Sequence, residues 1–133
     1  MNEFSLPIVG IDFANPDRHG SNRRSELMMT LPGTTLELRP EPTNRHDPHA
    51  VAVFAPSGIQ VGYLPAERAP YLAARLARGD EVRVIFQALT PTGAFARIRI
   101  GGGDPILPPP PKTPPSAADG DFSADPDGPE WGA

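Results

Sequence analysis

Apolar and polar residues alternate along most of the first hundred residues, which is the pattern of strands that bury one face. Turns rich in Pro, Gly, Asn and Asp separate the alternating segments. The expected strands cover residues 4–13, 24–31, 34–39, 51–54, 59–63, 81–89 and 94–100. Residues 24–31 suit a helix nearly as well as a strand, and we favour the strand there.

Two pairs of these strands form predicted hairpins, one through the turn at residues 55–58 and one through the turn at residues 90–93. One helix is expected over residues 65–78, because prolines stand at its entry and Gly79 follows its end. Short strands that close around one helix indicate a mainly β fold, a small barrel of the OB-like or SH3-like kind.

The composition changes near residues 101–103. Eleven arginines and no lysine precede that point against ten acidic residues, whereas Lys112 alone follows it against six acidic residues. The proline-rich acidic segment cannot bury enough apolar surface to offset the entropy cost of ordering it. We therefore expect a folded domain over residues 1–103 and a disordered tail rich in Pro and Asp over residues 104–133.

Several functional classes are disfavoured by composition. The near-neutral body has no basic run, which argues against strong non-specific binding of duplex DNA but permits contacts to a few nucleotides. The chain has no cysteine, so disulfides and cysteine-based zinc sites are excluded. It shows no nucleophile elbow and no phosphate loop, and we expect no enzymatic activity. Without a signal peptide or a membrane-spanning apolar run, we expect a soluble, cytoplasmic protein.

A polar loop over residues 40–50 is the candidate binding element, because its side chains cannot be ordered by burial and its prolines restrict the unfolded chain. Its polar side chains include those of Asn44, Arg45, His46, Asp47 and His49. Asp47 could accept hydrogen bonds from backbone amides in an Asx turn or from a ligand hydroxyl, and residue type favours the turn by about two to one.

His46 could stack on a base, pair with a phosphate or simply be solvated. His46, Asp47 and His49 offer too few converging ligands for zinc, so no metal and no cofactor is expected. Three aromatic residues at strand ends could fill the barrel or stack on bases: Phe13, Tyr63 and Phe95. Arginines that could contact phosphates, if they are not merely solvated, are Arg18, Arg23, Arg24, Arg45, Arg68, Arg97 and Arg99.

The segment Glu41-Pro42-x-Asn44-x-x-Asp47-Pro48-x-Ala50-Val51, followed by Gly62-Tyr63-Leu64-Pro65, resembles the HIRAN domain family, in its stand-alone bacterial form. The resemblance covers about residues 7–101. It implies a six-stranded barrel like the oligonucleotide-binding fold, with a short helix. It also implies a nucleic-acid-binding module, since members fused to Swi/Snf-type helicases capture 3′-hydroxyl ends of single-stranded DNA at stalled replication forks.

By motif position, the resemblance implies that Asp47 reads the 3′-hydroxyl, while the aromatic platforms are His46, Phe13 and Phe95. The remaining candidate binding residues are Tyr63 and the phosphate contacts Arg45, Arg68 and Arg97. Asp12 stands where DNA-binding members place a basic residue. The alternative function is a non-catalytic adaptor that uses the barrel and the proline-rich tail to bind a separately encoded helicase or nuclease.

Overall fold

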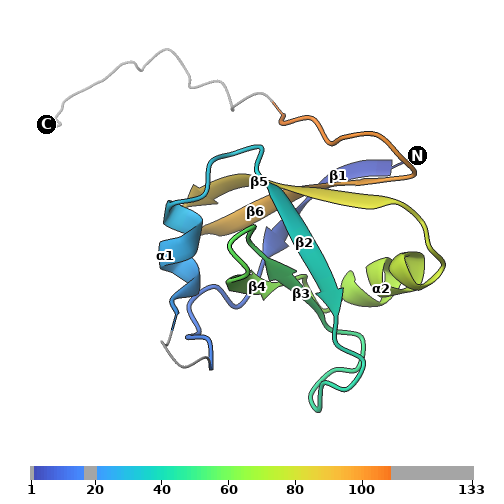
Figure 1. Cartoon of the computed structure of the whole chain (residues 1–133), viewed down its shortest axis with the longest axis horizontal. Coiled ribbons are helices and arrows are strands. Elements are labelled where there is room, and N and C mark those ends of the chain that lie inside the picture. Colours follow the sequence, from blue (N-terminus) through green and yellow to red (C-terminus); the bar gives the residue numbers. More distant parts are fainter. Residues whose placement is uncertain (1, 17–20, 109–133) are drawn as a thin grey trace, which may run out of the picture.

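The computed structural model describes residues 2–16 and 21–108. Its elements are β1 (Asn2–Ile8), α1 (Arg23–Met28), β2 (Thr35–Pro40), β3 (Val51–Phe54), β4 (Gln60–Tyr63), α2 (Ala69–Ala77), β5 (Val82–Thr90) and β6 (Gly93–Ile100). The six strands form one antiparallel sheet in the order β1-β6-β5-β2-β3-β4, curled into a half-barrel (Figure 1). This architecture confirms the expected mainly β fold and the six strands that the family resemblance implies.

The two edges of the sheet meet immediately after β1. The Val9 amide donates to the Tyr63 carbonyl at 2.8 Å, and the Tyr63 amide donates to the Val9 carbonyl at 2.9 Å. This antiparallel bridge joins the end of β1 to β4 and closes the curled sheet at one point. It also satisfies backbone groups that an open sheet edge would leave unpaired.

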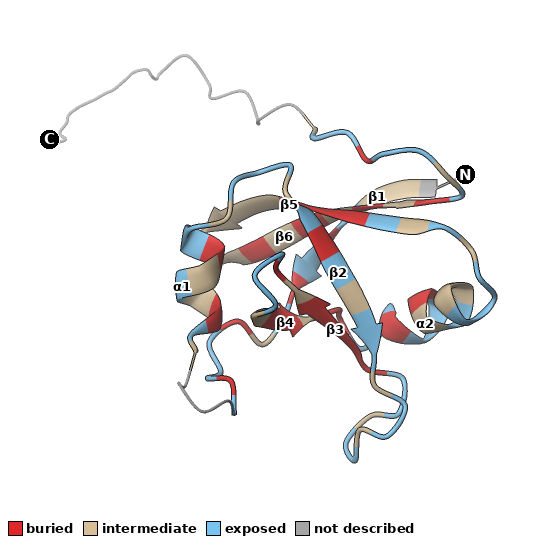
Figure 2. Ribbon diagram, in the orientation of Figure 1, coloured by how far each residue is buried: buried red, intermediate tan, exposed pale blue. Residues whose placement is uncertain are grey.

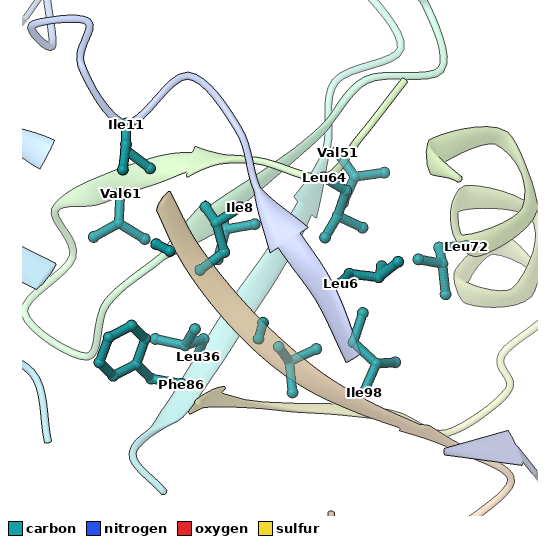
Figure 3. Packing of buried hydrophobic residues seen from close by; sticks show 14 of the residues in the cluster. Leu6, Ile8, Ile11, Leu36, Val51, Val61, Leu64, Leu72, Phe86 and Ile98 are labelled. Atoms are coloured by element: carbon teal, nitrogen blue, oxygen red, sulfur yellow. The ribbon is translucent and has the colours of Figure 1, made fainter. Parts of the chain in front are cut away.

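The concave face of the sheet holds the hydrophobic core, and the two helices lie on opposite sides of it (Figures 1 and 2). Along β6 every second residue is buried, as expected for a strand with one inward face. α1 contributes Leu27 to the core and α2 contributes Leu72, both fully buried. Inward side chains seen in Figure 3 include those of Leu6, Ile8, Leu36, Val51, Val61, Leu64, Phe86 and Ile98.

The segment expected as a strand over residues 24–31 is instead the helix α1, so the expectation of a strand there was wrong. The side chain of Asn22 caps the helix by accepting a hydrogen bond from the Ser25 amide at 2.9 Å. The cap and the burial of Leu27 against the core together stabilise a helix of only six residues. Two helices therefore flank the sheet, where the sequence indicated one.

Two element boundaries also differ from the sequence expectation. β1 ends at Ile8 and not at residue 13, because Gly10, with φ of 73°, turns the chain out of the sheet. α2 begins at Ala69, whereas residues 66–68 form a turn before it. The amides of Arg68 and Ala69 both donate to the Pro65 carbonyl at 2.9 Å, which fixes this turn against the start of the helix.

Residues after β6 run back along the barrel, so part of the expected tail contacts the folded body. Asp104 forms an ion pair with Arg83 at 2.6 Å, and Pro105 is buried. The Ile106 amide donates to Glu3 at 2.9 Å. The expected domain boundary at residue 103 stays a prediction, and residues 109–133 of the expected disordered tail lie outside the described residues.

The closure of the barrel requires glycine at residue 62. A Cβ atom placed there would lie 2.5 Å from the Val9 carbonyl oxygen and 2.6 Å from Cγ2 of Ile8. The carbonyl cannot move away without breaking its hydrogen bond to the Tyr63 amide. Any side chain at this position therefore forces β1 and β4 apart.

Gly62→Ala should lower the free energy of unfolding by about 3 kcal/mol, the upper end of overpacking costs. Urea denaturation measures the change. Gly58→Ala is the matched control, because φ there is +89° but nothing lies within 4 Å of the added Cβ. That control should cost about 1 kcal/mol from backbone strain alone. Equal costs at the two positions would contradict the steric role of Gly62.

Glu3 should make stability depend on acid pH. The hydrogen bond from the Ile106 amide, followed by those from Arg99 and Arg97, lowers the pKa of Glu3 from 4.5 to about 2. The stabilisation is therefore fully present above pH 4.5 and is lost as pH falls toward 2. Glu3→Gln should flatten the fall of unfolding free energy over this interval, as measured by urea denaturation.

The control for Glu3→Gln is Glu67→Gln, which removes an exposed carboxylate that makes no ion pair with any described residue. It changes the net charge by the same amount. A pH profile of Glu3→Gln that matches the unmodified chain would show that the Glu3 contacts do not contribute to the acid response.

Candidate functional site

A pocket of about 320 Å³ opens where the loop between β2 and β3 meets the closure of the barrel. It is lined by Val9, Asn44, His46, Asp47, Ala50, Tyr63, Leu64 and Ala66. The two residues that close the sheet, Val9 and Tyr63, are thus also walls of the pocket. Polar side chains from the loop face an apolar surface contributed by the barrel.

Side-chain hydrogen bonds order the loop. Oδ1 of Asn44 accepts from the His46 amide at 2.8 Å and from the Asp47 amide at 3.0 Å. Its Nδ2 donates to Oε1 of Glu41 at 2.9 Å, and the Tyr63 hydroxyl donates to the same oxygen at 3.0 Å. Glu41 thereby links the loop to the barrel and orients the Tyr63 ring.

Asn44 and Glu41 were not expected to hold other residues in place, although their hydrogen bonds fix the positions of His46, Asp47 and Tyr63. The role of Asn44 could have been predicted from the sequence, since an asparagine that precedes a short polar run favours an Asx turn. The role of Glu41 could not, because its partner Tyr63 is distant in the sequence and becomes a neighbour only through the closure of the sheet.

The two carboxylate oxygens of Asp47 differ in their surroundings. Its Oδ1 accepts from the His49 amide at 2.9 Å, which confirms the Asx-turn interpretation. Oδ2 makes no hydrogen bond with any described residue, and the half-buried carboxylate lines the pocket. One oxygen therefore holds the loop, while the other is available to a ligand.

His46 and Tyr63 are the two rings of the pocket. His46 is exposed and follows the loop arginine Arg45, whereas Tyr63 is half-buried. Phe13 does not line the pocket, but a Cβ atom built on Gly10 would lie 3.7 Å from Cδ2 of Phe13 and 3.9 Å from Cδ2 of Tyr63, so Gly10 lies near both rings. With 71% of its surface exposed, Phe13 offers a further ring in the loop after β1.

Arg23 is buried beside Tyr63 and is not available to a phosphate. This corrects the expectation that Arg23 is a solvated arginine or a phosphate contact. It is only 6% exposed and donates to the Gly10 carbonyl at 2.8 Å and to Oδ1 of Asn15 at 2.7 Å. Its guanidinium lies 5.6 Å from the centre of the Tyr63 ring. Asn15 in turn donates to the Gln60 carbonyl at 2.9 Å, tying the loop after β1 to β4.

Asp12 does not leave an isolated negative charge in the loop after β1. Its carboxylate accepts from Arg24, with 2.8 Å between the charged groups. Both side chains remain partly in solvent. The ion pair reduces the repulsion that this carboxylate would exert on an approaching anion.

Besides Phe13 and Arg45, three further residues of the candidate binding set do not line this pocket. Phe95 is half-buried on β6, opposite Pro7 of β1 and Ala88 of β5. Arg97 forms an ion pair with Glu3 at 3.1 Å. Arg68 lines a different pocket beside α2.

Most described arginines are already paired, and this narrows the set that could contact phosphates. Ion pairs hold Arg24, Arg39, Arg75, Arg78, Arg83, Arg97 and Arg99. Arg23 is buried, and Arg18 lies outside the described residues. Within residues 2–16 and 21–108, only Arg45 and Arg68 are exposed arginines without an ion pair.

Within the part of the chain that the structure describes, no group of three or more His, Cys, Asp or Glu side chains is arranged to hold a metal ion. In the same residues, no helix is both long enough and apolar enough to cross a membrane.

Comparison with known proteins identifies the fold and the family. The model of the HIRAN domain matches residues 2–93. The crystal structure of the HIRAN domain of human HLTF aligns with a TM-score of 0.57 and 17% identity over 74% of each chain. A protein from Lactobacillus plantarum aligns with a TM-score of 0.56 and 16% identity, over 74% of this chain and 99% of the other. No curated protein sequence matches.

Proposed function

The chain belongs to the HIRAN domain family of nucleic-acid-binding modules, and from that premise we propose that it binds the 3′-hydroxyl end of single-stranded DNA. The observation that carries the proposal is that Asp47, His46 and Tyr63 line one pocket. A carboxylate and two rings are the groups that a terminal nucleotide would need. The binding involves no chemical step.

The terminal base would stack against the rings of the pocket. Base–aromatic stacking contributes roughly 1–3 kcal/mol per base and tolerates any base, because every base has a π-face. Tyr63 is the better-fixed platform, since Glu41 holds its hydroxyl and Arg23 lies beneath its ring. His46 and the exposed Phe13 offer further faces, in the pocket and in the loop after β1 respectively.

Asp47 would read the end of the strand. Its Oδ2 is available to accept a hydrogen bond from a sugar hydroxyl, and hydrogen bonds to a charged acceptor are stronger than neutral ones. A 3′-phosphate would instead bring negative charge against the carboxylate. The hydroxyl, and not the base, would therefore determine selectivity.

Arg45 is the candidate contact for the phosphate next to the terminal nucleotide, because it is exposed, unpaired and adjacent to His46. Arg24 lowers the cost of an acidic residue at position 12 by pairing with it. A module with this selectivity would serve to recognise free strand ends in DNA repair or in the processing of replication forks.

A specific observation favours a second candidate function, that of a protein-interaction adaptor. Met28, Met29 and Leu31 at the end of α1 are 71%, 73% and 75% exposed. Clustered exposed apolar residues mark protein contacts, and methionine adapts to varied partners. A separately encoded helicase or nuclease is the partner that this function would require.

Asp47→Asn should remove the preference for a free hydroxyl while keeping the loop folded. The amide retains an oxygen that can accept from the His49 amide, but it loses the charge that would repel a 3′-phosphate. Fluorescence anisotropy with 5′-labelled single strands that end in a 3′-hydroxyl or a 3′-phosphate measures the effect. The unmodified chain should prefer the hydroxyl strand, and the variant should bind both strands with similar affinity.

Glu67→Gln is the control, since it removes one negative charge close to Ala66 without entering the pocket. It should preserve the preference for the hydroxyl. Equal affinity of the unmodified chain for the two strands would remove the proposed function.

Salt dependence separates the two functions. For single strands, each phosphate neutralised should contribute a slope of about −0.7 to the plot of log affinity against log salt. Binding to DNA should therefore weaken with salt, whereas docking through Met28, Met29 and Leu31 should respond little because it buries apolar surface. Met29→Glu should leave DNA affinity unchanged. A flat salt plot for DNA would favour the adaptor.

A further inference from the structure

A second pocket, of about 470 Å³, lies between the start of β1 and α2, and the proposed function does not use it. It is lined by Glu3, Phe4, Arg68 and Tyr71. Phe4 is half-buried and packs on the core, while Tyr71 is 43% exposed. The pocket therefore combines two rings with one of the two exposed arginines that lack an ion pair.

The two pockets are joined by one turn. Leu64 and Ala66 line the pocket that holds Asp47, and Arg68 and Tyr71 line the second pocket. Two residues of chain from Ala66 to Arg68 span at most about 7 Å, which is close to the reach of one extended nucleotide. The hydrogen bonds to the Pro65 carbonyl fix this turn. A strand that leaves the first pocket along the turn would next meet Arg68.

The charges in the second pocket favour an anion. Both oxygens of Glu3 are occupied, Oε1 by Arg99 at 2.8 Å and Oε2 by Arg97 at 3.1 Å. Arg68 lies 5.5 Å from the centre of the Phe4 ring and makes no ion pair with any described residue. The positive charge of this pocket is thus available, while its negative charge is already neutralised.

We propose that this second pocket is a subsite for single-stranded DNA, which takes the nucleotides 5′ of the terminal two, since the second nucleotide spans the turn between the pockets. Arg68 contacts a backbone phosphate, and the exposed Tyr71 provides a stacking face. The inference rests on the proposed function, because the first pocket fixes the end of the strand. The subsite increases the affinity for longer strands, whereas the first pocket selects strands by their 3′ terminus.

Competition with unlabelled oligothymidylates of two and six nucleotides, each with a free 3′-hydroxyl, tests the subsite by displacement of a 5′-labelled strand. Arg68→Gln and Tyr71→Ala should each weaken the six-nucleotide strand roughly tenfold, within the range for one lost stacking or phosphate contact. Binding of the dinucleotide should stay unchanged. Arg68→Gln should also reduce the salt slope for the longer strand by about 0.7.

Arg78→Gln is the matched control, because it removes the same charge at the end of α2 from a residue that lines neither pocket. It should change neither affinity. Thermal unfolding of all variants checks that the fold is kept, as Arg68 and Tyr71 are both exposed and outside the core.

The outcomes separate the subsite from the proposed function. If Arg68→Gln and Tyr71→Ala weaken both oligomers equally, or weaken neither, the subsite is overturned while a hydroxyl preference would still stand. If the unmodified chain binds six nucleotides without preference for the hydroxyl end, the proposed function fails, and with it the assignment of nucleotides to this subsite. Failure to bind either oligomer overturns both.

Discussion

The structure depends on one antiparallel bridge, the pair of hydrogen bonds between Val9 and Tyr63 that joins the two edges of the sheet. Gly62 permits this bridge, because any side chain there would overlap the backbone of the partner segment. The bridge also brings together groups that are far apart in the sequence: an exposed valine after β1, a tyrosine on β4 and the polar loop before β3. The bridge that closes the barrel therefore also brings together the residues that line the pocket.

Polar contacts, and not burial, order the side chains that the loop contributes to the pocket. Asn44 holds two amides of the loop, and Glu41 connects the loop to Tyr63. Asp47 is itself part of this arrangement through the His49 amide. A loop fixed in this way keeps its side chains near solvent yet in defined positions, which lowers the ordering entropy that ligand binding would otherwise cost. The same residues thus maintain the loop and present the carboxylate.

Much of the fold could be predicted from the sequence, because β3, β4, β5 and β6 follow alternation and turn chemistry, and α2 follows its flanking proline and glycine. α1 could not, since six residues show too little periodicity and the outcome depended on the Asn22 cap and on burial of Leu27. The family resemblance grouped Asp47 and His46 with Phe13 and Phe95, whereas the ring that lines the pocket beside Asp47 and His46 is that of Tyr63. Periodicity does not reveal a bridge between residues so distant in sequence. The sequence offered both Arg23 and Arg68 as possible phosphate contacts. The structure distinguishes them, because Arg23 is buried and Arg68 is exposed.

The use of arginine explains how a chain without a basic run can suit a nucleic-acid-binding family. Most described arginines neutralise acidic neighbours or, like Arg23, support the barrel, so they leave no broad positive surface for non-specific contacts. Arg45 and Arg68 are exceptions, and each lies next to a pocket or in one. Isolated charges beside aromatic rings contribute little long-range attraction, so a ligand must fit the pockets to gain affinity. Under the proposed function, this arrangement would suit a strand end better than continuous duplex, because only an end can place a base and a 3′-hydroxyl in the same pocket.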